Sequence, residues 1–297
     1  MNFKALLKGH QNFSGTIAMI NATEEPLINV IVEVLNKTKA EFILYNYQDA
    51  SELIRSFDLS PELLTRIHIH TFETQDEAIE HCLDDLYHQK AHILMKGQIP
   101  TAQILSAVLK RNAVDSKPFL NHLAICEIPT YHKLLMISDV ALNITPSVED
   151  TKAMINNIVR FARQLDYDSL NIALLSSVEK VSNKIPSTLK AQTLQQFYAS
   201  HPIDEDILIE GPYALDNAID KKSAIQKGIH TKVAGNADVL IVPGLDAGNV
   251  LYKSLTYFGH AKVASLILGA RFPIVLTSRA DSIENKVNSI LVVLKFI

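Results

Sequence analysis

Hydrophobic residues along this chain alternate between two patterns. Short runs that are almost wholly apolar, such as residues 91–95 and 272–277, have the length and composition of strands buried on both faces. Runs such as residues 76–89 and 101–111 carry apolar residues at three- and four-residue spacing, which predicts amphipathic helices. Strands that alternate with helices of this length predict βαβ units, so we expect an α/β fold with mostly parallel sheets.

The middle of the chain departs from this alternation. Two apolar runs, residues 122–127 and 134–139, are joined by a turn-like segment and predict an antiparallel pair at a sheet edge. Ser147 and Asp150 then have the spacing of a capping box at the start of a helix.

We place the domain boundary near residues 130–140. The first α/β domain then comprises residues 1–133 plus 268–297, and residues 134–267 form an inserted second α/β domain. The return to the first domain is expected because the strand, loop and helix of the last segment resemble those of residues 91–111.

Composition narrows the class of protein. Of the 297 residues, 47% are hydrophobic and 20% are charged, which favours a well-buried globular core. A net charge of -4 argues against a nucleic acid partner. The chain has neither a long apolar run nor a signal-peptide core, and its two cysteines form no CxxC motif. We therefore expect a cytoplasmic protein with no membrane partner.

The most informative segment begins where residues 272–277 end. Ser278 and Arg279 place a hydroxyl beside a permanent cation, and a helical pattern follows with Asp281 or Ser282 as its N-cap. A strand that leads into a helix N-terminus through such a pair suits an anion. The alternative is structural, with Arg279 paired to Asp281 or Glu284.

Two further strand-to-helix loops carry residues that suit an anionic ligand. Their glycines allow a backbone N–H to approach a ligand closely, although a tight turn would also require them. In the second loop we expect the helix to begin near Val250. The candidate residues are Lys96, Gly97 and Thr101 in the first loop and Gly244, Asp246, Gly248 and Asn249 in the second, with Lys253 in the first turn of the helix that follows. In an open parallel sheet, such loops meet at the carboxyl ends of the strands.

The sequence gives little indication of a metal-binding site. Asp216 and Asp220 are four residues apart on an expected helical turn and could bind a metal ion together. No histidine or cysteine accompanies them, so we expect a solvated face and no metal site. His68 and His70 are expected on one face of a strand as a surface pair.

Four segments together resemble a known family. They read LMKGxxxTA, EGPYALDNAI, ADVLIVPGLDAGNVLYK and ILGARFPIVLTSRADSIENK, in this order. Over roughly residues 91–297 the chain resembles the phosphate acetyl/butyryltransferase family, and SRADSxENK is most similar to phosphate butyryltransferases. The resemblance implies two α/β domains with an interdomain cleft, similar to isocitrate and isopropylmalate dehydrogenases, and a homodimer.

The resemblance also implies a reaction. A short-chain acyl group, butyryl-like, passes reversibly between CoA and inorganic phosphate when the CoA thiol attacks acyl phosphate directly. CoA is a substrate, and no other cofactor or metal is implied. Ser278 would donate to the oxyanion and Arg279 would bind phosphate. Lys96, Gly97 and Thr101 match the family segment near the acyl phosphate, and Gly248, Asn249 and Lys253 match the segment that borders the cleft.

Two departures from the family pattern leave alternatives open. Phosphotransacetylases carry an Asp seven residues after the Ser as the proposed thiol base, and here that residue is Asn285. The proton could go to Glu284, Asp281 or another residue, or a thiol of pKa ~8.5 could react through its ionised fraction. Pro100 replaces a histidine of some relatives.

Three other functions remain as alternatives to a phosphate butyryltransferase. A phosphate acetyltransferase is one, and a non-catalytic CoA-binding relative is another, supported by Asn285 and Pro100. An oxidoreductase similar to isocitrate dehydrogenase ranks last, because it needs a cluster of aspartates for a metal.

Overall fold

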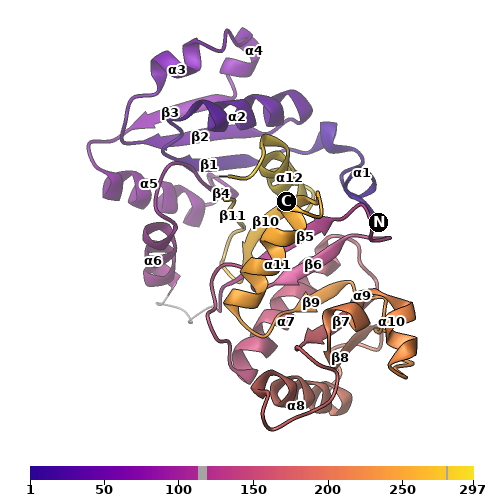
Figure 1. The fold of residues 1–297 in the computed structure, drawn as a ribbon. Coiled ribbons are helices and arrows are strands. Elements are labelled where there is room, and N and C mark those ends of the chain that lie inside the picture. Colours follow the sequence, from indigo (N-terminus) through magenta and orange to yellow (C-terminus); the bar gives the residue numbers. More distant parts are fainter. Residues whose placement is uncertain (113–118, 279) are drawn as a thin grey trace. The chain divides into compact units, whose positions relative to one another are not determined.

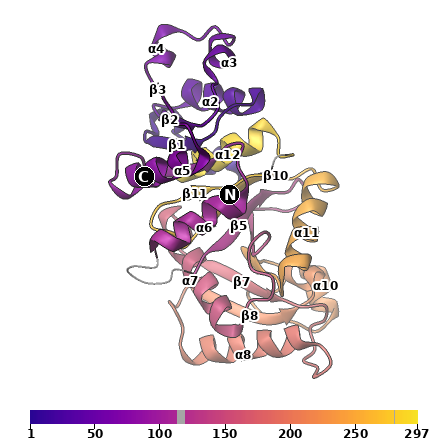
Figure 2. The same ribbon diagram turned by 90° about the vertical axis from the view of Figure 1, so that its left-hand side faces the viewer.

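The computed structural model describes residues 1–112, 119–278 and 280–297 of the chain (Figures 1 and 2). Contacts divide the chain into two compact units. Unit 1 contains Met1–Phe3 and Phe119–Val263, and unit 2 contains Lys4–Pro118 and Ala264–Ile297.

Unit 2 is built on a sheet whose strands follow the order β3-β2-β1-β4-β11-β10. All neighbouring pairs are parallel except β10 and β11, which are antiparallel. The strands are β1 (Thr16–Ile20), β2 (Glu41–Asn46), β3 (Ile67–Thr71), β4 (Ile93–Lys96), β10 (Lys262–Leu268) and β11 (Ile274–Val275).

Helices connect these strands, and short helical turns lie at the chain start and after β2. The long ones are α2 (Glu25–Lys37), α5 (Gln75–Tyr87), α6 (Thr101–Asn112) and α12 (Ile283–Leu294). The short ones are α1 (Phe3–Leu6), η1 (His10–Asn12), α3 (Ser51–Arg55) and α4 (Pro61–Leu64).

Helix α12 differs from the amphipathic helices, because every residue from Lys286 to Leu294 is buried. It packs against α2 and β11, whereas α5 packs against β1 and β2 (Figure 1). A helix that is buried all round is fixed on every side by its neighbours. The body of α12, from Lys286 on, is therefore held firmly, and the segment that contains Ser278 leads directly into this helix.

The strands of unit 1 follow the order β5-β6-β9-β7-β8. β5 and β6 are antiparallel, and the other neighbours are parallel. The strands are β5 (Asn121–Glu127), β6 (Leu135–Ser138), β7 (Leu170–Leu175), β8 (Ile207–Tyr213) and β9 (Val239–Ile241). The helices are α7 (Val148–Gln164), α8 (Pro186–Ser200), α9 (Leu215–Ile219), α10 (Lys221–Gln226) and α11 (Leu245–Tyr257).

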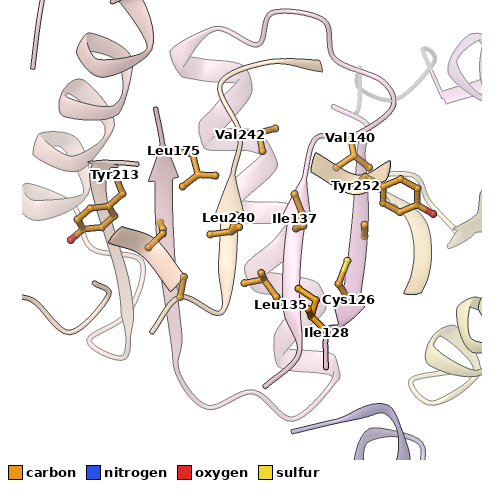
Figure 3. Packing of buried hydrophobic residues seen from close by; sticks show 14 of the residues in the cluster. Cys126, Ile128, Leu135, Ile137, Val140, Leu175, Tyr213, Leu240, Val242 and Tyr252 are labelled. Atoms are coloured by element: carbon orange, nitrogen blue, oxygen red, sulfur yellow. The ribbon is translucent and has the colours of Figure 1, made fainter. Parts of the chain in front are cut away.

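A continuous cluster of buried apolar side chains covers one face of the sheet in unit 1. Ile137 of β6 and Leu240 of β9 are fully buried and extend from neighbouring strands, and Tyr252 of α11 belongs to the same cluster (Figure 3). Burying a side chain of this size contributes about 1.5–3 kcal/mol. Packing of α11 on the cluster sets the position of its first turn.

The expected α/β alternation with mostly parallel sheets is confirmed, as are the antiparallel pair and the Ser147–Asp150 capping box. Two expectations about elements are wrong. β11 forms ladder bonds at only two residues of the apolar run 272–277. Helix α11 begins at Leu245 and not near Val250, because Gly244 already serves as its N-cap.

The division into units also differs from the expected domain boundaries. Residues 119–133, expected in the first domain, belong to unit 1, since β5 pairs with β6 there. Residues 264–267, expected in the inserted domain, belong to unit 2, where Leu266 and Ile267 pair with β11. Among the residues described, none forms a helix that is both long and apolar enough to cross a membrane.

Candidate active site

Three neighbouring strands of unit 2 bring their carboxyl ends to one edge of the sheet. β4 lies between β1 and β11 and is parallel to both, with Lys96 opposite Ile20 and Met95 opposite Val275. The segments that follow these strands therefore start side by side. Ser278 and the Lys96–Gly97 pair, singled out separately in the sequence, belong to this one edge.

The Ser278 segment is a turn closed by its own aspartate. The backbone N–H of Ser278 donates to Asp281 Oδ2 at 2.6 Å, and the N–H of Asp281 donates to Ser278 O at 3.2 Å. The ammonium of Lys286 donates to the carbonyl of Asp281. These contacts fold the backbone onto itself, while the side chain of Ser278 stays exposed. Arg279 lies outside the described residues.

Helix α12 begins directly after this turn. Of the two N-cap candidates, Ser282 is the cap, because its Oγ accepts the backbone N–H of Asn285 at 3.1 Å. Glu284 is exposed and Asn285 is half-buried, and both lie in the first turn of α12. The positive end of the helix dipole thus lies beside residues that the sequence predicts to be catalytic.

Lys286 is a buried cation that sequence reasoning did not identify. It is 6% exposed, and burial lowers its pKa, while the negative charges of Asp281 and Glu24 oppose that shift. Its place in the chain, just after Asn285, was the only available signal. The structure gives it a role in holding the Ser278 turn.

Lys96 and Gly97 both contact backbone oxygens of neighbouring residues. The Lys96 ammonium donates to Gly97 O at 3.1 Å and to Ile99 O at 3.0 Å. A Cβ on Gly97 would lie 2.3 Å from Ile20 O, so the close approach that this glycine permits is to the end of β1. Thr101 is half-buried at the first residue of α6.

A polar network that the sequence did not reveal holds the segment after β4. The carbonyl of Gln98 accepts from Asn21 Nδ2 at 3.1 Å and from Tyr47 Oη at 3.2 Å. Its side-chain oxygen accepts from Thr23 Oγ1 at 2.8 Å. Asn21 adopts a φ of 58°, a conformation that asparagine tolerates better than most residues. The network joins the segments after β1, β2 and β4.

In unit 1, Gly248 and Asn249 lie inside the first turn of α11 and not in a loop. A Cβ on Gly248 would lie 2.2 Å from Asp139 O, and Asn249 Nδ2 donates to Val140 O at 3.3 Å. Both residues therefore face the segment that follows β6. Lys253 is exposed, four residues further along the helix.

Asp139 organises that segment, which runs over residues 139–146 and is called here the β6–α7 loop. Its carboxylate is 1% exposed and accepts four hydrogen bonds. Oδ1 accepts the N–H groups of Ala141 and Leu142 at 2.8 and 2.9 Å. Oδ2 accepts His122 N–H at 3.1 Å and Asn143 Nδ2 at 2.6 Å. The sequence showed Asp139 only as the end of an apolar run.

The carboxylates considered for a metal have local partners. Asp220 caps α10 by accepting Ser223 N–H at 2.7 Å, and backbone hydrogen bonds there lower its pKa. Asp216 lies in α9 and accepts from Asn217 Nδ2 at 3.3 Å. Within residues 1–112, 119–278 and 280–297, His, Cys, Asp and Glu side chains form no group of three or more that could hold a metal ion.

Comparison with known proteins agrees with the resemblance seen in the sequence. The family model described as "Phosphate acetyl/butaryl transferase" matches residues 84–294. The "Probable phosphate butyryltransferase" of Bacillus subtilis is 39% identical over 281 residues, covering 93% of this chain and 91% of that protein. The "Phosphate butyryltransferase" of Clostridium beijerinckii is 34% identical, covering 92% and 90%.

Solved structures show the same fold. A branched-chain phosphotransacylase from Enterococcus faecalis aligns with a TM-score of 0.83 and 29% identity, covering 94% of this chain and 98% of that one. A 4-hydroxythreonine-4-phosphate dehydrogenase from Klebsiella pneumoniae aligns with a TM-score of 0.57 and 9% identity, covering 96% and 99%. The second likeness shows a dehydrogenase-like α/β fold.

The family model and these relatives show that the chain is an acyltransferase. The chain belongs to the phosphate acetyl/butyryl transferase family.

Proposed function

We propose that this enzyme transfers a short-chain acyl group, butyryl-like, reversibly between CoA and inorganic phosphate. The observation that carries the proposal is the exposed Ser278 side chain, which lies on an anchored turn at the same sheet edge as the Lys96–Gly97 pair. Family membership and the names of the relatives support this reaction.

Ser278 would act through its hydroxyl. Attack of the CoA thiol on acyl phosphate produces a tetrahedral intermediate whose oxygen carries negative charge. The backbone N–H of Ser278 already donates to Asp281, so the hydroxyl is the donor that this residue can offer to the oxyanion. One such donor is typically worth ~3 kcal/mol of transition-state stabilisation. Arg279 is proposed as the cation that binds the phosphate oxygens.

The thiol proton has two proposed routes. Asp281 is a poor candidate for the base, because its carboxylate closes the Ser278 turn. Glu284 is exposed and could accept the proton, with Asn285 beside it as a neutral group. Alternatively, a thiol of pKa ~8.5 supplies a few per cent of thiolate at neutral pH and needs no base.

The pH profile of Glu284→Gln separates these routes. With no base, the variant keeps the wild-type rate, and kcat/KM rises with pH in parallel for both proteins until the thiol is ionised near pH ~8.5. With Glu284 as base, the variant is slower below that pH, and the two profiles converge above it.

The remaining properties are proposed from composition and resemblance. We propose a cytoplasmic homodimer that binds CoA or acyl-CoA, phosphate and acyl phosphate. It would need no metal or further cofactor, and would have neither a nucleic acid nor a membrane partner. The net charge of -4 supports the absence of nucleic acid binding. Sedimentation of the purified protein tests the dimer.

Activity against a series of acyl-CoAs tests the reaction. The purified protein is mixed with acetyl-, butyryl- and branched-chain acyl-CoA and phosphate, and the released thiol is measured. Phosphate-dependent release that is fastest with butyryl-CoA supports the proposal. A clear preference for acetyl-CoA would identify a phosphate acetyltransferase, and CoA binding without cleavage would identify a non-catalytic relative.

A further inference from the structure

We propose that Lys190 is a positioning residue that sets the first turn of α11 for binding CoA. The inference rests on the proposed function and on the family resemblance, by which Gly248 and Asn249 are expected to bind substrate. The sequence alone indicates no role for Lys190.

Lys190 joins two segments that follow neighbouring strands. From α8 its ammonium donates to Pro146 O at 2.9 Å and to Pro243 O at 3.1 Å. Pro146 ends the β6–α7 loop, and Pro243 lies between β9 and α11. β6 and β9 are paired in parallel, so a single cation ties together their two carboxyl-end segments. Hydrogen bonds from a charged donor are stronger than those from a neutral one.

The segments that Lys190 joins also meet along the first turn of α11. The N–H of Leu245 donates to Ile144 O at 3.0 Å, the Cα of Gly248 packs against Asp139 O, and Asn249 donates to Val140 O. The helix start therefore lies on the β6–α7 loop at three points. The Lys190 bridge adds a further connection between the same two segments, at the Pro146 end of the loop and the Pro243 end of the helix segment.

The local electrostatics fit a bridging role. Burial lowers the pKa of Lys190, and the negative charge of Asp150 in α7 opposes that shift. A partly desolvated ammonium depends on its carbonyl partners in place of water. An apolar side chain at this position would leave both carbonyls without this donor.

The test compares Lys190→Met and Lys190→Arg with a control, Lys227→Met, which removes an exposed lysine paired to Glu179 at 3.1 Å. We expect Lys190→Met to raise the KM and the Kd for CoA about tenfold, which corresponds to ~1.4 kcal/mol, with kcat changed less than about threefold. Arginine can also donate to two carbonyls, so Lys190→Arg is expected to recover most of the affinity. Lys227→Met should match the wild type.

Three results would overturn the inference. One is a Lys190→Met protein with a lowered Tm but an unchanged Kd for CoA, which would show a purely structural role. Another is a fall in kcat with KM unchanged. The third is a Lys190→Arg protein as impaired as Lys190→Met.

Calorimetry measures the Kd for CoA without turnover, so it tests the role of Lys190 independently of the proposed reaction. If the wild type binds CoA but shows no turnover, the proposed reaction fails, whereas the Kd values of the variants still decide the role of Lys190. If Lys190→Met does not fold, Lys190→Gln replaces it in the same comparison.

Discussion

The backbone N–H of Ser278 donates to Asp281 Oδ2 at 2.6 Å, which makes Asp281 the residue that closes the turn after β11. Asp281 also receives the Lys286 ammonium on its carbonyl. Its carboxylate thus serves the geometry of the turn, and the Ser278 hydroxyl is the group left to meet a substrate.

Asp281→Ala should loosen this turn and lower kcat by about tenfold or more, since misplaced catalytic groups lose rate steeply. Asp281→Asn keeps an oxygen that can accept the Ser278 N–H, and should retain most of the rate. Steady-state kinetics on both variants check this. If Asp281→Asn is as slow as Asp281→Ala, the negative charge matters more than turn closure.

Ser278→Ala should reduce kcat by about 100- to 1,000-fold, the usual effect of removing one oxyanion donor. The side chain is exposed, so the Tm should stay near that of the wild type. Ser106→Ala, at an exposed serine of α6, is the matched control and should keep full activity. Wild-type turnover by Ser278→Ala would remove Ser278 from the catalytic site.

Gly97→Ala should destabilise the protein. Its Cβ would lie 2.3 Å from one backbone oxygen and 2.6 Å from another, those of Ile20 and Asn21, which cannot move independently of β1. Overpacking of this kind typically costs ~1–3 kcal/mol. Urea unfolding measures the effect. Gly228→Ala is the control, because nothing lies within 4 Å of its Cβ and its cost of about 1 kcal/mol comes from a φ of +72° alone.

Lys286 should make stability depend on pH in the alkaline range. Burial lowers its folded-state pKa, so between that value and the unfolded value of ~10.4 the unfolded chain binds more protons than the folded chain. The free energy of unfolding contributed by Lys286 therefore rises with pH across this window. Urea titrations should show a smaller rise for Lys286→Met. An equal rise would mean that other groups cause it.

Sequence patterns predicted the local elements well. The helices α5 and α7 have apolar faces, and the side chains of Thr74 and Ser147 cap their N-termini. The expected strand at residues 272–277 was too long. An apolar run indicates burial, but a strand also needs hydrogen-bonded partners, and in β11 only Ile274 and Val275 have them. Gly248 appeared to be a loop residue because glycine usually interrupts helices, yet here it allows α11 to pack on Asp139.

The candidate site was predicted only in part. The Ser278 segment and Lys96–Gly97 could be found because each follows an apolar run and combines residues that suit anions. Asp139, Lys190 and Lys286 could not, since their roles depend on contacts with backbone carbonyls and N–H groups that are distant in sequence or formed by a turn. Buried charges of this kind become visible only once the chain is folded.

The proposed reaction is tested by phosphate-dependent release of CoA from butyryl-CoA by the purified protein. Thiol release is followed with and without phosphate, in the wild type and in Ser278→Ala. We predict release that requires phosphate, yields butyryl phosphate in equal amount and nearly disappears in Ser278→Ala. Release that ignores phosphate, or that persists unchanged in Ser278→Ala, would contradict it.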